Sequence, residues 1–282
     1  MTSPTAATKP PVPAEISRSW LLLSARAEDR FDAARASRSD QLILDLEDGV
    51  DPSQKDSARE SVLKWFAEEN DAWVRFNVHG TSYWEDDVEL LRGNSGLSGV
   101  MLAKVESADQ VTETFERLGS TTPVIPLIES AIGIERAVEI AQAKGVFRLA
   151  FGSGDYRRDT GTSATDLAMS YPRSRLTVAS AIAGLTGPID GPTVSKSHPI
   201  LREQSETAVS LGLTGKLCLD TNQLPVINEM FSPPASDVGW AREFLAEFNA
   251  RGRVVRDGSD LPRLHRAERI DGLARAFGID PA

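Results

Sequence analysis

Short apolar runs alternate with amphipathic helical patterns along most of the chain. The runs with strand character lie at 19–24, 41–47, 72–77, 99–104, 122–129, 147–153, 187–191 and 215–220. Helical patterns fill the intervals between them. Strands that alternate with helices indicate a parallel sheet, and eight units within about 220 residues match the usual size of a closed barrel. We therefore predict an α/β fold, a (β/α)8 TIM barrel, over residues 19–232. A doubly wound open sheet is the alternative, but no G-x-G-x-x-G motif follows the first run.

The two ends of the chain depart from this rhythm. Residues 1–18 contain four prolines and lack the apolar core of a signal peptide, which predicts a disordered leader. After Asp220 the pattern changes to a proline break, a helix, the turn-rich stretch "RVVRDGSDLP" and a terminal helix. Residues 233–282 are too few for an independent domain, so we expect a C-terminal helical extension that acts as a lid.

The charge and cysteine content narrow the functional classes. Acidic residues outnumber lysine and arginine by 41 to 31, so a general nucleic-acid surface is not expected. Cys218 is the single cysteine, which excludes an intrachain disulfide and a zinc-binding spacing. No apolar run reaches the length of a membrane span. We expect a cytoplasmic protein that binds neither nucleic acid nor membrane.

Polar residues gather where the predicted strands end. In a barrel of this type, the active site lies at the carboxyl ends of the strands. The polar residues at these ends are Asp45, Glu47, Asp48, Arg75, Asn77, Lys104, Glu129, Asp155, Asp190, Asp220 and Asn222. Acids dominate this rim, and each one taken singly is more often a helix cap or a surface ion pair than a ligand.

The stretch "ILDLEDGV", residues 43–50, is an apolar strand that contains carboxylates. Because side chains alternate between the two faces, Asp45 and Glu47 share the face opposite to the flanking leucines and should point into the barrel. Arg75 is out of phase with its apolar neighbours and should also point inward. Adjacent strands lie about 4.8 Å apart, so we expect Arg75 to pair with Asp45 or Glu47. Asp48 belongs to the turn that leaves the strand.

Glu129 and Asp155 follow strands that are one βα unit apart. Two carboxylates at the tops of adjacent strands repel each other unless a cation lies between them, and Mg²⁺ takes one or two protein carboxylates together with water and substrate oxygens. The nearby glycines 152 and 154 would let the backbone approach a ligand. Lys104 could form a Schiff base, but a solvated or ion-paired lysine is the commoner role. Cys218 lies in an apolar pattern typical of a buried residue.

Taken in order, "SWLLLS…DRF", "ILDLEDGV…QKDSARE", "VRFN", "GVMLAKVES", "PLIES", "RLAFGSGD", "GPIDGPT" and "GKLCLDTNQ…VINEMFSP" resemble the citrate lyase beta-subunit-like proteins of the HpcH/HpaI aldolase/citrate lyase family. The resemblance implies a Mg²⁺-dependent carbon-carbon lyase or synthase that acts on a 3-hydroxyacyl-CoA thioester, such as citramalyl-, malyl- or citryl-CoA. The products are an acyl-CoA and an oxo acid. It also implies a homotrimer or a multiple of one.

The resemblance assigns roles to individual residues. Glu129 and Asp155 match the family's metal ligands, and Arg75 matches the arginine that faces the substrate carbonyl. Glu47 matches the acid beside the metal, which holds its waters or orients the arginine. Asp260, in the lid segment "DGSDLP", is the expected acid or base that reaches the site of a neighbouring subunit.

Three stretches depart from the family pattern. Ser24–Glu28 replaces a Pro-Gly-Asn-Arg-Pro-like turn that helps to hold CoA, although Arg26 and Arg30 could compensate, with Lys104 as a further candidate for substrate or CoA binding. Asp220 and Thr221 replace a His-Pro pair, and the lid segment is shorter. The alternatives are a non-catalytic or complex-dependent citrate-lyase-beta-like subunit, a metal-dependent aldolase on a CoA-free hydroxy-oxo acid, a lyase that also hydrolyses its thioester, and a Schiff-base aldolase that uses Lys104.

Overall fold

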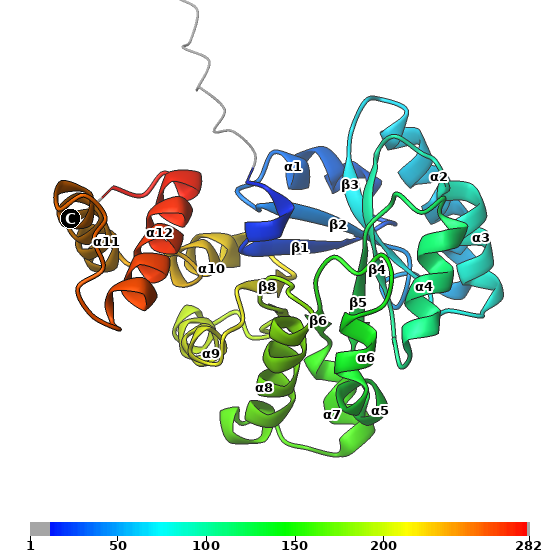
Figure 1. Ribbon diagram of the computed structural model, residues 1–282. Coiled ribbons are helices and arrows are strands. Elements are labelled where there is room, and N and C mark those ends of the chain that lie inside the picture. Colours follow the sequence, from blue (N-terminus) through cyan, green and yellow to red (C-terminus); the bar gives the residue numbers. More distant parts are fainter. Residues whose placement is uncertain (1–11, 281–282) are drawn as a thin grey trace, which may run out of the picture.

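The computed structural model describes residues 12–280 and contains a closed barrel of eight parallel strands, β1 to β8 in chain order (Figure 1). The strands are β1 (Ser19–Ser24), β2 (Gln41–Asp45), β3 (Ala72–Phe76), β4 (Leu97–Leu102), β5 (Val124–Ile128), β6 (Ala150–Phe151), β7 (Ile189–Asp190) and β8 (Gly215–Cys218). All eight coincide with strands predicted from the sequence. The closed order β1 to β8 confirms the barrel and excludes the open sheet.

Helices surround the barrel and connect successive strands. The α-helices are α1 (Phe31–Arg35), α2 (Lys55–Phe66), α3 (Ser82–Leu91), α4 (Ala108–Arg117), α5 (Ala131–Glu135), α6 (Ala137–Ala141), α7 (Ser153–Thr160), α8 (Asp166–Ile182), α9 (His198–Ser210) and α10 (Leu224–Met230). Short 3-10 turns occur at Ala14–Ile16, Glu28–Arg30, Pro52–Gln54 and Thr221–Gln223. Among residues 12–280, no helix combines the length and the apolar character needed to cross a membrane.

The barrel wall separates two apolar layers. The interior of the barrel holds a small cluster that includes Trp20, Ile43, Trp73 and Met101. Leu44 belongs instead to the larger cluster between the strands and the outer helices. This division confirms the alternation expected for "ILDLEDGV", because Ile43 faces inward while the next residue faces the helices.

The N-terminal ends of the strands are closed by a buried arginine. Arg148 has no exposed surface and donates to the carbonyl oxygens of Ser17 and Gly187, each at 2.9 Å, and to Thr214 Oγ1 at 2.8 Å. Burial lowers its pKa to about 9. The 3-10 turn Ala14–Ile16 lies just before Ser17. Residues 12–18, which fall within the expected leader, therefore contact the bottom of the barrel, and the rest of that leader lies outside the described residues.

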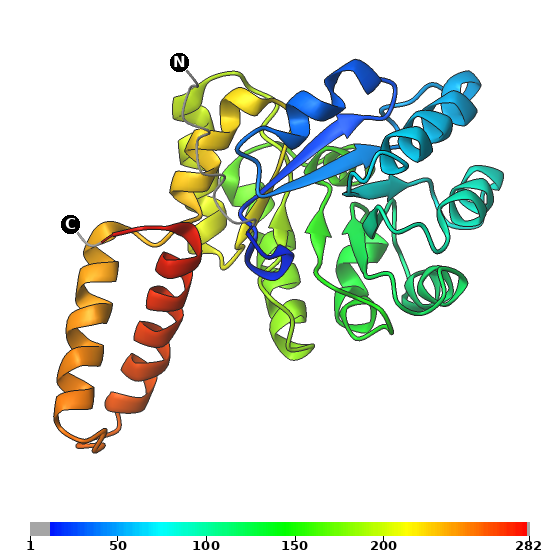
Figure 2. The same ribbon diagram turned by 90° about the horizontal axis from the view of Figure 1, so that it is seen from above.

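The C-terminal segment forms a helical hairpin of α11 (Ala235–Ala250) and α12 (Asp260–Phe277). The hairpin has its own apolar core, which includes Phe244, Phe248 and Leu264. Figure 2 shows it beside the barrel with its connecting loop pointing away from the strands. The boundary expected between 232 and 233 falls in the short segment that joins α10 to α11.

Candidate active site

Arg75 on β3 is clamped by the carboxylate of Asp45 on β2. Its Nε and Nη2 donate to the two carboxylate oxygens of Asp45, each at 2.7 Å, and its Nη1 lies 3.3 Å from Glu47 Oε2. Asp45 also accepts from the backbone amides of Glu47 and Gly49. Burial opposes the charged guanidinium, but the hydrogen bonds to Asp45 together with the charges of the surrounding carboxylates outweigh it and raise the pKa of Arg75. The pair expected from strand alternation is therefore present, and it fixes the arginine geometrically.

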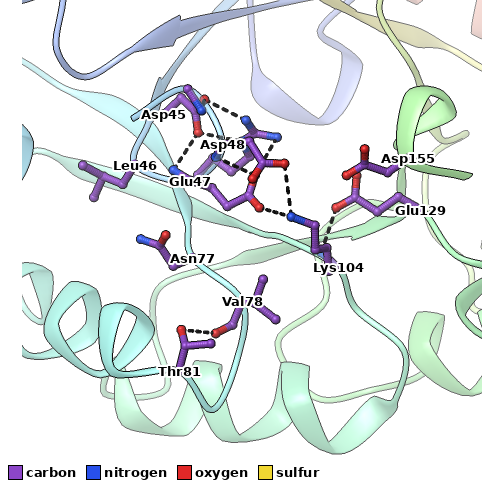
Figure 3. A network of polar contacts seen from close by, with 12 residues as sticks. Asp45, Leu46, Glu47, Asp48, Asn77, Val78, Thr81, Lys104, Glu129 and Asp155 are labelled. Carbon is purple, nitrogen blue, oxygen red and sulfur yellow. Dashed lines mark hydrogen bonds and ion pairs between the residues drawn. The ribbon is translucent and has the colours of Figure 1, made fainter. Parts of the chain in front are cut away.

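Glu47 follows β2 and connects this clamp to Lys104, which follows β4. Its carboxylate accepts from the backbone amide of Asp48 at 2.8 Å and pairs with Lys104 Nζ (Figure 3). Lys104 Nζ also lies 3.1 Å from Asp48 Oδ2. Burial raises the pKa of Glu47 even though Arg75 and Lys104 oppose that shift. The three acidic residues of "ILDLEDGV" are thus paired with two cationic side chains, Arg75 and Lys104.

The environment of Lys104 does not suit a Schiff base. Burial alone would lower the pKa of this amine, but the hydrogen bond and charge of Glu47, followed by those of Asp48, outweigh burial and raise it. A nucleophilic lysine needs a lowered pKa so that the neutral amine is populated near neutral pH. The ion-paired role is the one that the structure shows.

Glu129 and Asp155 lie side by side at the carboxyl ends of β5 and β6 (Figure 3). Glu129 follows β5 directly, is 6% exposed, and its Oε1 accepts from the backbone amide of Lys104 at 2.9 Å. Asp155 occupies the first turn of α7 and lies 3.1 Å from the exposed guanidinium of Arg158. Burial and then the charge of Asp155 raise the pKa of Glu129 to about 8. This pair carries more negative charge than its surroundings neutralise.

Such a pair fits a divalent cation. A bound cation would remove the repulsion that raises the Glu129 pKa. A Cβ on Gly152 would lie 2.3 Å from Glu129 Oε2, so only glycine lets this carboxylate adopt its position, whereas a Cβ on Gly154 would meet nothing within 4 Å. Within residues 12–280, no group of three or more His, Cys, Asp or Glu side chains could hold a metal. A cation here would therefore keep several water or substrate ligands, which is typical of Mg²⁺.

A cavity of about 410 Å³ opens above this pair. It is lined by Lys104, Glu106, Glu129, Ser130, Asp155, Arg158 and Asp159. Four of these, Glu106, Ser130, Arg158 and Asp159, were not predicted from the sequence. They could have been found by position, because each follows a strand end by a few residues or lies one helical turn from a predicted ligand.

Asp260 is the first residue of α12, at the end of the hairpin that points away from the barrel (Figure 2), and it does not line this cavity. It is 4% exposed, its Oδ2 lies 2.8 Å from Arg251 Nη2, and the same oxygen accepts from the backbone amide of Arg256 at 2.8 Å. The backbone hydrogen bond and then Arg251 lower its pKa. Within one chain, Asp260 therefore stabilises the hairpin loop rather than the site.

The remaining predicted residues occupy other positions. Arg26 and Arg30 are exposed in the segment after β1. Asp220 accepts from the backbone amide of Asn222 at 2.9 Å and caps the turn that follows β8.

Two residues predicted for the rim lie behind the barrel wall. Asp190 has no exposed surface and is bound by Lys216 Nζ at 2.7 Å and by Arg173 of α8 at 2.9 Å. Asn77 is also buried and donates to Asp87 of α3. Their position at strand ends correctly predicted where along the barrel axis they lie, but not that they face the outer helices.

Comparisons with known proteins agree with this geometry. The model of the family HpcH/HpaI aldolase/citrate lyase matches residues 18–221, and that of the HpcH/HpaI aldolase C-terminal domain matches residues 236–278. A citrate lyase subunit beta-like protein of Mycobacterium tuberculosis is 33% identical, with 88% of this chain and 92% of that protein covered. The mitochondrial citramalyl-CoA lyase of Homo sapiens is 28% identical, with 92% and 86% covered.

A solved structure shows the same likeness in three dimensions. It is the CitE protein of Mycobacterium tuberculosis in complex with magnesium, acetoacetate and coenzyme A. The TM-score is 0.75 at 29% identity, with 93% of this chain and 98% of the other covered. The match over residues 18–221 together with the closed barrel confirms the resemblance, and the chain belongs to the HpcH/HpaI aldolase/citrate lyase family.

Proposed function

We propose that this protein is a Mg²⁺-dependent carbon-carbon lyase, or synthase in reverse, that acts on a 3-hydroxyacyl-CoA thioester such as citramalyl-, malyl- or citryl-CoA. The observation that carries the proposal is the Glu129–Asp155 pair, with the Glu129 pKa raised to about 8, next to a clamped arginine at the mouth of the barrel. One relative is named a citramalyl-CoA lyase, and another was solved in complex with magnesium, acetoacetate and coenzyme A. Both support the same reaction class.

Glu129 and Asp155 would hold the cation. When bound, Mg²⁺ supplies positive charge for the hydroxyl and carboxylate oxygens of the oxo-acid half. The backbone amide of Lys104 holds Glu129 in the orientation required. Because Glu129 is almost fully buried, its second oxygen has few alternatives to a cation.

Arg75 would stabilise the negative oxygen that develops as the bond breaks. Cleavage removes the hydroxyl proton, turns that hydroxyl into a carbonyl and sends the bonding electrons to the thioester enolate, which then takes a proton to become an acyl-CoA. The bidentate contact with Asp45 leaves Nη1 of Arg75 to face Glu47 and the site. A fixed donor of this kind is effective because it does not reorganise during the reaction.

The other residues have supporting roles in the proposal. Arg26, Arg30 and Lys104 would contact the CoA or the substrate. Asp260 would act as acid or base in the site of a neighbouring subunit, in a homotrimer or a multiple of one. Its position on a hairpin that leaves its own barrel supports a role between chains.

The test is a panel of 3-hydroxyacyl-CoA thioesters incubated with the protein and Mg²⁺, with both the oxo acid and the acyl-CoA measured. We expect equal amounts of the two products, loss of activity with EDTA, and loss of both activity and Mg²⁺ binding in Asp155→Asn. Free CoA without an oxo acid would indicate hydrolysis instead. Binding of Mg²⁺ without turnover of any thioester would refute the lyase in favour of a binding subunit. Cleavage of free hydroxy-oxo acids alone would favour the CoA-free aldolase.

A further inference from the structure

A buried lysine supports the acidic turn after β2 from the side of the outer helices. Lys55 is the first residue of α2 and is 6% exposed. Its Nζ donates to the backbone carbonyl oxygens of Leu46 and Glu47, each at 2.7 Å, and to Asn77 Oδ1 at 2.6 Å. These three contacts use all three donors of the ammonium group, and all three acceptors are neutral.

The contact of Lys55 with Asn77 continues into a buried polar chain. Asn77 Nδ2 and its backbone amide donate to Asp87 Oδ2 at 2.7 and 2.9 Å. Asp87 has no exposed surface and also accepts from Arg59 Nε at 2.7 Å. The helices α2 and α3 are thereby connected to the ends of β2 and β3, where Leu46 and Asn77 lie close to Glu47 (Figure 3).

Stability alone does not explain a lysine at this position. Positive charge in the first turn of a helix opposes the helix dipole, and burial of an ammonium group requires its dehydration. Burial lowers the pKa of Lys55 against the attraction of Glu47 and Asp87. A residue that violates local preferences in this way is expected near functional sites, where position matters more than stability.

The turn after β2 is held from two sides. On the inner side, the carboxylate of Asp45 accepts from the amides of Glu47 and Gly49. On the outer side, Lys55 binds the carbonyl oxygens of Leu46 and Glu47. Because both peptide groups that flank Glu47 are fixed, the direction of its side chain toward the barrel mouth is fixed as well.

We propose that Lys55 is a positioning residue that holds the Leu46–Glu47 backbone so that the Glu47 carboxylate meets Arg75 and Lys104. The readout in turnover rests on the proposed lyase function. The positioning of Glu47 is geometric, and Lys55 would contact neither substrate nor metal.

The test uses Lys55→Met, the milder Lys55→Gln, and Lys64→Met as a matched control on the same helix, where the lysine is exposed and pairs with Glu28. We expect each Lys55 variant to lower kcat by at least about tenfold, since small displacements of catalytic groups have effects of this size. The Kd of Mg²⁺ should change by less than about twofold, because Glu129 and Asp155 do not contact Lys55. The control should retain the kcat of the unmodified protein.

A double-mutant cycle separates positioning from a general loss of structure. If Lys55 acts through Glu47, adding Lys55→Gln to Glu47→Gln should lower kcat no further, whereas independent effects would multiply. Multiplied losses, or an unchanged kcat in the folded Lys55→Gln protein, would overturn the proposal. Should Lys55→Met fail to fold, Lys55→Gln carries the test.

The positioning role of Lys55 can also be tested without measuring turnover. An inactive unmodified protein would refute the proposed function and leave the geometry to be measured directly. In that case, a crystal structure of Lys55→Gln should show Glu47 displaced from its 3.3 Å contact with Arg75. Retention of that contact would overturn the positioning role.

Discussion

Replacing Glu129 with glutamine should make the metal-free protein more stable while abolishing Mg²⁺ binding. The substitution keeps the acceptor for the Lys104 backbone amide and removes the charge that lies next to Asp155. The folded protein raises the pKa of Glu129 from the ordinary value of 4.5 to about 8, so folding disfavours the ionised form. Ionised Glu129 therefore lowers the free energy of unfolding.

The magnitude follows from linkage. Below pH 4.5, Glu129 is protonated in both the folded and the unfolded protein and does not change the free energy of unfolding. Because its pKa is raised in the folded protein, the loss of stability grows as pH rises from 4.5 to about 8, and it is constant above that. Each pKa unit corresponds to about 1.4 kcal/mol, which gives about 3 kcal/mol at pH 7 as an upper value. For a chain of this size we expect an increase in Tm of roughly 6 °C.

Thermal unfolding in EDTA at a series of pH values measures this effect. Glu139→Gln is the control, because it removes the same charge from an exposed position on α6. The advantage of Glu129→Gln should vanish near pH 4.5, and added Mg²⁺ should raise the Tm of the unmodified protein but not that of the variant. A variant that is less stable than the unmodified protein at pH 8, or that still binds Mg²⁺, would refute the reasoning.

Three further outcomes follow from the site. Gly152→Ala places a Cβ 2.3 Å from Glu129 Oε2 and should weaken Mg²⁺ binding in calorimetry, whereas Gly154→Ala should not; equal affinities would contradict the packing argument. Arg75→Lys loses the bidentate contact and should lower kcat about a hundredfold with little change in Mg²⁺ affinity, so an unchanged kcat would exclude a role for the guanidinium. Borohydride added with pyruvate should not label Lys104, because Glu47 and Asp48 raise the pKa of this amine in spite of its burial. A stable adduct seen by mass spectrometry would restore the Schiff-base alternative.

The barrel was predictable because its sequence signal is local. Every strand is a short apolar run, and within the strands simple alternation correctly placed Asp45 and Arg75 inside and Leu44 outside. Heights along the barrel were predictable for the same reason, so Glu129 and Asp155 were correctly placed just after the carboxyl ends of neighbouring strands.

Partners that come from distant helices were not predictable in this way. Asp190 shares its height with the rim, yet its ion pairs with Arg173 and Lys216 turn it toward α8. The support of Lys55 for the turn after β2 depends on how α2 packs, which no short pattern specifies. The proposed role of Asp260 requires a neighbouring subunit, and it stays a prediction.

The contacts of Arg148 have a consequence for the order of folding. Its three main acceptors come from the segments before β1, β7 and β8: Gly187 and Thr214 lie 39 and 66 residues from Arg148 in the sequence, and Ser17 lies 131 residues away. The contact with Ser17 cannot form until the segment before β1 reaches the C-terminal half of the barrel, and contacts of such sequence separation are slow to form. We expect the guanidinium to lose its water only in the final closure, so that substitutions at Arg148 accelerate unfolding more than they slow folding. The buried arginine would then contribute to the kinetic stability of the closed barrel by slowing its unfolding.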